Sequence, residues 1–331
     1  MTPALRNLSP SPRVAIIGAG MCGLACAKRL LKAGLLPTVF DKGRGIGGRM
    51  ATRRGGAGLN FDHGAQYVTA RLPAFSTMLE EAIATERASD WNPDGRRDTV
   101  SAAGDWIVGT PDMSALAKFL SDGLDVRVSQ EVRAVRRDAH GWRVQTTSNP
   151  AGAVFDFVVV TAPAPQARTL LADSPEFQAE LDRVVMAPCW ALLIAFDERL
   201  EVPFDVRRPE TGDLGWLARN SSKSGRSAEK DCWVIHASPA WSIAHLELGR
   251  ESVAATMSGL LARTVGRDLP TPHFVTAHRW RYALTTEPLG RPFLASRDQT
   301  LLVGGDWCLG ARVEYAFESG LAIADALLSR R

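Results

Sequence analysis

Along the chain, segments with a strand-like pattern of apolar residues alternate with segments in which apolar residues recur at helical spacing. Continuous apolar runs, typical of strands buried on both faces, occupy residues 14–17, 155–161, 189–197, 232–237 and 300–303. Alternating runs, typical of half-buried strands, occupy residues 124–128, 131–137, 142–146 and 273–280. Apolar positions at helical spacing predict helices over residues 72–87, 112–121, 166–184, 251–265 and 313–329, and a further helix just after residue 23. Residues 1–12 predict a disordered lead, and residues 91–104 predict a loop or short hairpin.

The first strand leads into a glycine motif, Gly18-Ala19-Gly20-Met21-Cys22-Gly23. Here Gly18 permits a tight turn, Gly20 lets backbone amides approach a pyrophosphate, and Gly23 lets the helix pack against the strand. Asp41 ends the next strand, where a carboxylate accepts the hydroxyls of an adenosine ribose. The stretch therefore predicts a dinucleotide bound at a helix N-terminus.

A second glycine-rich, cationic loop begins at Lys42, directly after Asp41, and contains Gly47-Gly48-Arg49-Met50. We expect it to wrap the same pyrophosphate from the other side; the alternative is a solvated basic loop. A glycine motif, an acid and this second loop together resemble the signature of flavoproteins related to the monoamine oxidases. Residues 41–50 are most similar to the renalase-like members.

This resemblance implies FAD as the cofactor and an α/β fold. It implies a Rossmann-like FAD-binding domain of p-hydroxybenzoate hydroxylase/amine oxidase-like topology, beside a domain built on a mostly antiparallel sheet plus helices. A chain of 331 residues is long enough for two domains. We expect the FAD-binding domain to comprise residues 1–70, 102–168 and 296–331, and the substrate domain to comprise residues 71–101 and 169–295.

The resemblance also implies contacts with FAD outside the two glycine loops. Residues 59–67 run past the flavin, the backbone of Val132 contacts the adenine, and Asp306 holds the ribityl chain near a helix that begins at Val313. Asp306 could instead cap that helix, and His63 could be catalytic rather than structural or cofactor-binding. The predicted cofactor residues are Gly18, Gly20, Met21, Cys22, Gly23, Asp41, Lys42, Gly48, Arg49, Met50, His63, Gly64, Ala65, Gln66, Val132, Gly305, Asp306 and Val313.

Cys308 lies close to Asp306, which raises the covalent flavin attachment found in monoamine oxidases. The local sequence, Asp306-Trp307-Cys308-Leu309, is not the cysteine motif of those enzymes. We therefore expect non-covalent FAD.

The substrate side is predicted from what this sequence shares with each branch of the family. Monoamine oxidases use two aromatic rings and a buried lysine near the flavin N5, whereas this chain has three tyrosines and no lysine in a convincing buried strand. Residues 219–223, 233–236 and 278–282 instead resemble the renalase substrate side. We expect hydrogen bonds to a carboxamide or ribose from Asn220 and His236, and a stacking wall from Trp280 and Tyr282.

Each of these substrate-side assignments has a simpler alternative. His236 could be a satisfied core histidine, and Trp280 could be an ordinary core residue. Arg219, Arg279 and Arg281 are candidates for binding substrate phosphates, or else belong to a solvated face. His245 and His273 are expected to be structural.

The activity implied by the resemblance is oxidation of the 2- and 6-dihydro isomers of NAD(P)H to NAD(P)+, with dioxygen reduced to hydrogen peroxide. Loss of hydride restores aromaticity in such a substrate, so the enzyme mainly has to orient the ring. The alternatives are a flavin amine oxidase or desaturase-like oxidoreductase and a non-catalytic flavin redox sensor.

Composition limits the partners. A net charge of +3 spread along the chain argues against nucleic acid or a membrane surface. The five cysteines are scattered without metal spacing, so we expect no metal site and reduced thiols in a cytoplasmic protein. The longest apolar run is far too short to span a membrane. The sequence does not specify the oligomeric state.

Overall fold

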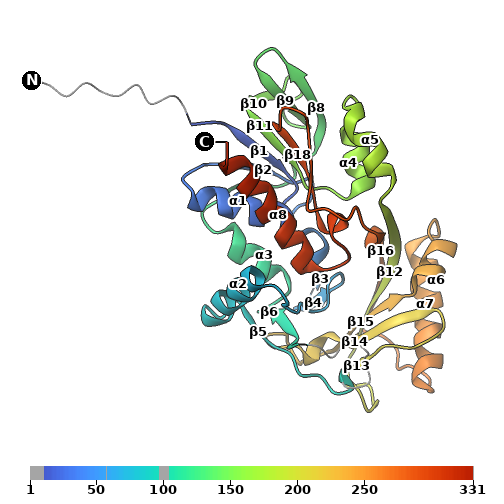
Figure 1. Cartoon of the computed structure of the whole chain (residues 1–331). Helices are drawn as coiled ribbons and strands as arrows, with labels where there is room; N and C mark the ends of the chain where they lie inside the picture. The colour runs from blue at the N-terminus through green and yellow to red at the C-terminus, as the bar shows by residue number, and fades with distance from the viewer. Residues whose placement is uncertain (1–10, 57, 97–103, 331) are drawn as a thin grey trace, which may run out of the picture.

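The computed structural model describes residues 11–56, 58–96 and 104–330, which form an α/β part and a part built on an antiparallel sheet (Figure 1). Most of the lead predicted at residues 1–12, and the centre of the 91–104 stretch, lie outside the described residues. Two long strands, β12 (Val185–Phe196) and β16 (Phe274–Glu287), run from the junction of the two parts into the second sheet.

The α/β part is organised around β1 (Val14–Ile17), which lies inside a six-stranded sheet of order β17-β18-β11-β1-β2-β7. All neighbours are parallel except β17, which is antiparallel to β18. The remaining strands are β2 (Thr38–Phe40), β7 (Asp125–Arg127), β11 (Phe157–Val160), β17 (Leu294–Ala295) and β18 (Leu301–Val303).

Alternate residues of β1 enter two different cores. Val14 and Ile16 pack with α1 (Met21–Lys32), α3 (Ser114–Ser121) and α8 (Val313–Leu328) on one face of the sheet. Ala15 and Ile17 pack on the other face with a second layer. That layer consists of β8 (Val132–Asp138), β9 (Gly141–Thr146), β10 (Ala153–Phe155), α4 (Ala164–Leu170) and α5 (Pro175–Asp182). Because both faces are covered, every residue of β1 is buried and the strand reads as a continuous apolar run.

Two small elements connect the α/β part to the rest. The hairpin of β3 (Thr52–Gly56) and β4 (Leu59–Asp62) leads from the second glycine loop towards the second sheet, and β4 contacts β15 there. The helix α2 (Pro73–Ala84) precedes the paired strands β5 (Ala88–Asp90) and β6 (Ile107–Gly109). Its Phe75 packs on Phe317 of α8, with ring centroids 5.4 Å apart.

The second sheet has the order β13-β14-β15-β12-β16 and is antiparallel throughout. Its other strands are β13 (Val206–Arg207), β14 (Leu214–Arg219) and β15 (Asp231–Ala237). The helices α6 (Pro239–Ala244) and α7 (Arg250–Val265) cover one face. The predicted combination of a Rossmann-like domain with a mostly antiparallel sheet and helices is confirmed. The domain boundaries given above stay a prediction.

Several predicted elements differ from the structure. The helix predicted over residues 166–184 is two helices, because α4 ends at Leu170 and Pro175 occupies the first turn of α5. The strand predicted to end at residue 280 continues to Glu287. The β3–β4 hairpin and α6 were not predicted.

Candidate functional site

The turn between β1 and α1 needs glycine for two separate reasons. Gly18 has φ +111°, in the left-handed region that favours glycine. A Cβ on Gly23 would lie 2.0 Å from the carbonyl oxygen of Gly18, so helix and turn could not pack. A Cβ on Gly20 would meet no atom within 4 Å. Gly20 therefore borders open space beside the N-terminus of α1, which has no side-chain cap.

Asp41 lies beside this helix start. Its carboxylate accepts hydrogen bonds from the backbone N–H groups of Ala19 and Gly43, both at 2.7 Å. Since an ionised carboxylate has about four acceptor positions, it retains capacity for ligand hydroxyls.

The second glycine loop packs directly on the first. The N–H of Gly47 donates to the carbonyl of Ala19 at 2.8 Å, and a Cβ on Gly48 would lie 3.5 Å from Cα of Gly20. Met50 is buried beneath the loop, and Lys42 donates to Gln166 at 3.0 Å. The two glycine loops therefore form one unit around the start of α1.

The C-terminal segment joins this unit through Asp306 in the short helix η4 (Asp306–Cys308). Arg49 of the second loop binds Asp306 with both guanidinium ends, at 2.8 and 2.5 Å. Gly305 donates its N–H to Ser319 of α8, which begins at Val313. The structure thus brings residues more than 250 positions apart to one place.

Ring side chains from β15 and β16 gather around His63, which directly follows β4. The carbonyl of His63 is 3.2 Å from Nε2 of His236 and accepts the indole N–H of Trp280 at 2.9 Å. The His63 ring lies 4.5 Å from that of His278 and 4.8 Å from that of Trp280. The predicted residues His63, His236 and Trp280 are therefore neighbours, although His63 follows β4, His236 lies in β15 and Trp280 lies in β16.

Burial keeps these histidines neutral. It lowers the pKa of His63 to about 3, with a smaller effect of the nearby His278 and Arg53. It lowers the pKa of His236 and that of His278 to about 4. Nδ1 of both His63 and His278 is buried with no hydrogen-bond partner. The cluster therefore offers uncharged donors, acceptors and ring faces at neutral pH.

Comparison with known proteins identifies the family. The family model described as flavin containing amine oxidoreductase matches residues 101–328. The chain belongs to the flavin-containing amine oxidoreductases. A second model, described as an NAD(P)-binding Rossmann-like domain, matches residues 16–82.

Proteins similar to this chain are named for different activities. Protoporphyrinogen oxidase 2 (chloroplastic/mitochondrial) of Arabidopsis thaliana is 38% identical over 69 residues, which cover 21% of this chain and only 13% of that protein. A candidate protoporphyrinogen oxidase from Exiguobacterium sp. 255-15 aligns with a TM-score of 0.76 and 16% identity, over 98% of this chain and 100% of its own. Wild-type putrescine oxidase bound to putrescine aligns with a TM-score of 0.70 and 15% identity, over 97% and 99%. At such identities the structures show the shared fold.

FAD is the cofactor of this oxidoreductase family, and the chain's own residues fit it. The open space at Gly20, the uncapped start of α1 and the Asp41 carboxylate suit a pyrophosphate and its adenosine ribose. The linker into β8 lies against the second loop, because Gln130 donates its N–H to the carbonyl of Asp41. Val132, two residues further along the chain, begins β8. The individual contacts with FAD stay predictions.

Cys308 does not resemble an attachment point for a flavin. It is buried, and burial raises the pKa of its thiol far above the ordinary value. A thiol that remains protonated is a poor nucleophile, which favours non-covalent FAD.

Two of the predicted substrate residues need correction or closer definition. Asn220 is 1% exposed. Its side-chain nitrogen donates to the carbonyl of Asn60, and its side-chain oxygen accepts the N–H of Asp62. Its amide is thus committed to holding β4, contrary to the prediction that it binds substrate. Tyr282 lies where β16 bulges against β12, so strand alternation does not fix the direction of its ring.

The predicted phosphate-binding arginines have other partners. Arg219 is fully buried, and it binds Asp205 at 2.8 Å and Asp231 at 2.5 Å. It belongs neither to a phosphate site nor to a solvated face. Arg279 and Arg281 both bind the exposed Glu247, which supports the solvated-face alternative for them.

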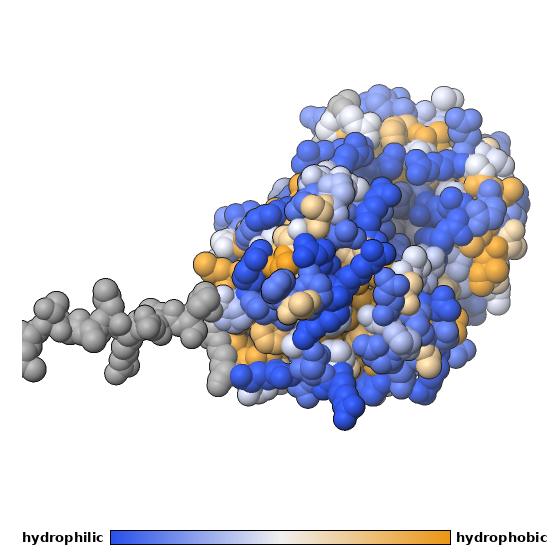
Figure 2. Space-filling model, turned by 90° about the horizontal axis from the view of Figure 1, so that it is seen from above, coloured by the Kyte–Doolittle hydropathy of each residue, from blue (hydrophilic) through white to orange (hydrophobic). Residues whose placement is uncertain are grey.

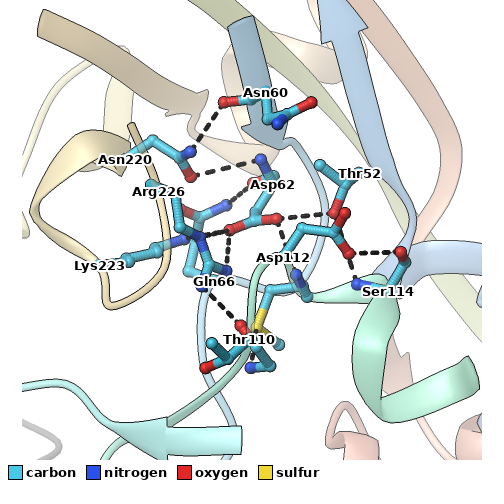
Figure 3. A network of polar contacts seen from close by, with 12 residues as sticks. Thr52, Asn60, Asp62, Gln66, Thr110, Asp112, Ser114, Asn220, Lys223 and Arg226 are labelled. Carbon is cyan, nitrogen blue, oxygen red and sulfur yellow. Dashed lines mark hydrogen bonds and ion pairs between the residues drawn. The ribbon is translucent and has the colours of Figure 1, made fainter. Parts of the chain in front are cut away.

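A buried lysine escaped the sequence prediction because it stands in a loop and not in a strand. Lys223 follows the short helix η3 (Asn220–Ser222), and its side chain is 0% exposed. Its Nζ lies 3.3 Å from Asp62 and 3.2 Å from Gln66 (Figure 3). The mostly apolar residues 214–218, which precede Arg219 and Asn220, were a weak signal that this segment enters the interior.

The described residues contain no helix long and apolar enough to cross a membrane. They also contain no group of three or more His, Cys, Asp or Glu side chains placed to hold a metal ion. The face shown in Figure 2 is largely hydrophilic, with hydrophobic residues in small groups and a hollow between its two halves.

Proposed function

We propose that this flavoprotein oxidises the 2- and 6-dihydro isomers of NAD(P)H to NAD(P)+, with dioxygen as acceptor and hydrogen peroxide as product. The observation that carries this proposal is the convergence of His236 and Trp280 on the carbonyl of His63, within a cluster of neutral histidines. Such a site can orient a nicotinamide ring without supplying a general base. Hydride loss from the isomer needs no base, because it restores aromaticity.

The hydrogen bonds define what each residue does. With its Nε2–H donated to the His63 carbonyl, neutral His236 presents Nδ1 as an acceptor for a carboxamide N–H or a ribose hydroxyl. The indole N–H of Trp280 is used on the same carbonyl, which fixes the ring so that one face can stack on the substrate. FAD, when bound, supplies the hydride acceptor. We further propose that the protein works in the cytoplasm, where its five buried free cysteines would stay reduced.

One observation favours a second function, that of a flavin amine oxidase. The sequence argued against it for lack of a buried lysine, and Lys223 removes that argument. Putrescine oxidase has the same fold. However, Nζ of Lys223 is already engaged by Asp62 and Gln66.

Anaerobic reduction of the purified yellow protein distinguishes these functions. The protein is mixed separately with 6-dihydro-NAD, 2-dihydro-NAD, ordinary NADH and benzylamine or putrescine, while flavin absorbance is followed. We expect rapid bleaching by the isomers alone, and stoichiometric peroxide when air is admitted. Bleaching by an amine alone would establish the second function, and bleaching by none of them would favour a redox sensor.

A further inference from the structure

A buried charge cluster lies where the β3–β4 hairpin meets the loop after β14 (Figure 3). Asp62 ends β4, and its Oδ2 binds Nζ of Lys223 at 3.3 Å and Nη2 of Arg226 at 2.5 Å. The side chains of Asp62 and Lys223 are 0% exposed, and that of Arg226 is 2% exposed. The other carboxylate oxygen accepts the Thr52 hydroxyl and the N–H of Met113.

The cluster contains more charge than an ion pair requires. Two cations, Lys223 and Arg226, contact the single carboxylate of Asp62. Desolvating a second cation is unfavourable, and Arg226 alone would satisfy Asp62. Lys223 must therefore have a use beyond neutralising that carboxylate.

The second partner of Lys223 indicates this use. Its Nζ lies 3.2 Å from Oε1 of Gln66. The amide nitrogen of Gln66 in turn donates to the carbonyls of Asp62 and Gly64. Lys223 thus holds both ends of the segment 62–66, one through a carboxylate and the other through an amide.

The residues between these ends are fixed from other directions. The N–H of Ala65 donates to the carbonyl of Arg49 at 2.9 Å, and a Cβ on Gly64 would lie 1.9 Å from that same oxygen. The carbonyl of His63 is the shared anchor of His236 and Trp280. A small shift of the segment would therefore displace both side chains.

We propose that Lys223 is a positioning residue. By holding Gln66 and Asp62, it fixes the backbone of residues 62–66 and thereby the placement of His236 and Trp280. The expected change in substrate binding rests on the proposed function. The expected change in the protein surroundings of the flavin does not.

The test compares Lys223→Met with Lys230→Met in the FAD-loaded protein. Lys230 lies in the same loop but pairs with the exposed Asp197, which makes it a matched control. For Lys223→Met we expect a changed visible circular dichroism spectrum of the flavin. We also expect KM for the dihydronicotinamide isomer to rise roughly tenfold while kcat changes less than threefold, because substrate placement and not the reacting groups is altered. Lys230→Met should match the wild type in both measurements.

Gln66→Leu tests the same link from its other end and serves if Lys223→Met does not fold. If both residues act through one contact, Gln66→Leu should reproduce the spectral change, and the double variant should be no worse than either single variant. Fully additive effects, or a Lys223→Met protein that only melts at lower temperature with an unchanged flavin spectrum and KM, would overturn the proposal. The flavin spectrum needs no substrate, so this test remains decisive if none of the isomers is oxidised.

Discussion

Burial of single side chains decides the chemistry of this site. His63 is 4% exposed and lies against His278, so its protonation would place a charge in an apolar setting beside a second imidazole. The same reasoning keeps His236 neutral. The site therefore works through hydrogen bonds and ring faces over the whole physiological pH range.

This burial predicts a pH-dependent stability. Because the pKa of His63 is lowered to about 3, the unfolded chain takes up a proton between pH 6.5 and 3 that the folded chain does not, and stability falls as pH falls through that window. The wild-type protein should lose free energy of unfolding when the pH is lowered from 7 to 5. In the His63→Gln variant this loss should be smaller by about 2 kcal/mol. Urea denaturation at pH 7 and at pH 5 measures the free energy of unfolding of both proteins. His140→Gln, at an exposed turn, is the control and should leave the loss unchanged.

Arg219 provides a second test at the scale of one residue. Arg219→Met leaves Asp205 and Asp231 buried without their shared cation. We expect a loss of about 3–5 kcal/mol in the free energy of unfolding, measured by urea denaturation. Arg279→Met, which breaks an exposed pair with Glu247, should cost less than about 1 kcal/mol. If the Arg219→Met protein were as stable as the wild type but had lost substrate affinity, the result would instead support a role of Arg219 in binding substrate phosphates.

At the scale of elements, the strand–turn–helix unit separates folding from ligand binding. Gly18 and Gly23 are needed for the turn and for helix packing, whereas Gly20 has ordinary φ −83° and open space around it. The same motif thus contains structural and cofactor-facing glycines.

Two alanine substitutions distinguish these roles. Gly20→Ala should leave the apo protein's melting temperature unchanged but weaken FAD binding at least tenfold, since the new methyl occupies the open space. Gly23→Ala should lower the melting temperature itself, because its Cβ would collide with the carbonyl of Gly18. Thermal unfolding of apo protein and fluorimetric titration with FAD measure the two effects. Equal destabilisation by both variants would contradict this division.

Elements are also where local pattern was least reliable. A single helix was predicted across residues 170–175, yet α4 ends at Leu170 and a new helix, α5, begins at Pro175. The β3–β4 hairpin escaped prediction because its strand β3 is polar and glycine-containing, and it is held by pairing with β4.

At the scale of the whole molecule, the first and last parts of the chain close on each other through Arg49 and Asp306. The pair is bidentate, Asp306 is buried, and Arg49 also donates to the carbonyl of Ala283. It therefore ties the second glycine loop to both η4 and β16.

Asp306→Asn tests this closure. The amide keeps the shape of the carboxylate but loses its charge, so we expect the free energy of unfolding to fall by about 1–3 kcal/mol and FAD affinity to fall as the loop loosens. Asp325→Asn removes an exposed pair between α8 and α1 and is the control, with little effect expected on either quantity. Denaturation of the apo protein and FAD titration are the measurements. Equal behaviour of the two variants would assign Asp306 no role in closure.

The sequence by itself predicted the central strands and the glycine turns of the α/β part, and its resemblance to a known family implied the cofactor class and the α/β architecture. These features depend on local geometry, namely a left-handed φ at Gly18, a continuous apolar run at β1 and an acid at Asp41 after the second strand. The tertiary structure alone decided which charges are buried. Lys223 meets Asp62 across 161 positions, and Arg219 meets Asp205 and Asp231 across a sheet whose register no local pattern specifies. From sequence alone a charged side chain is predicted to be exposed to solvent, because its burial is favourable only when a partner of opposite charge lies beside it, and the fold determines that partner.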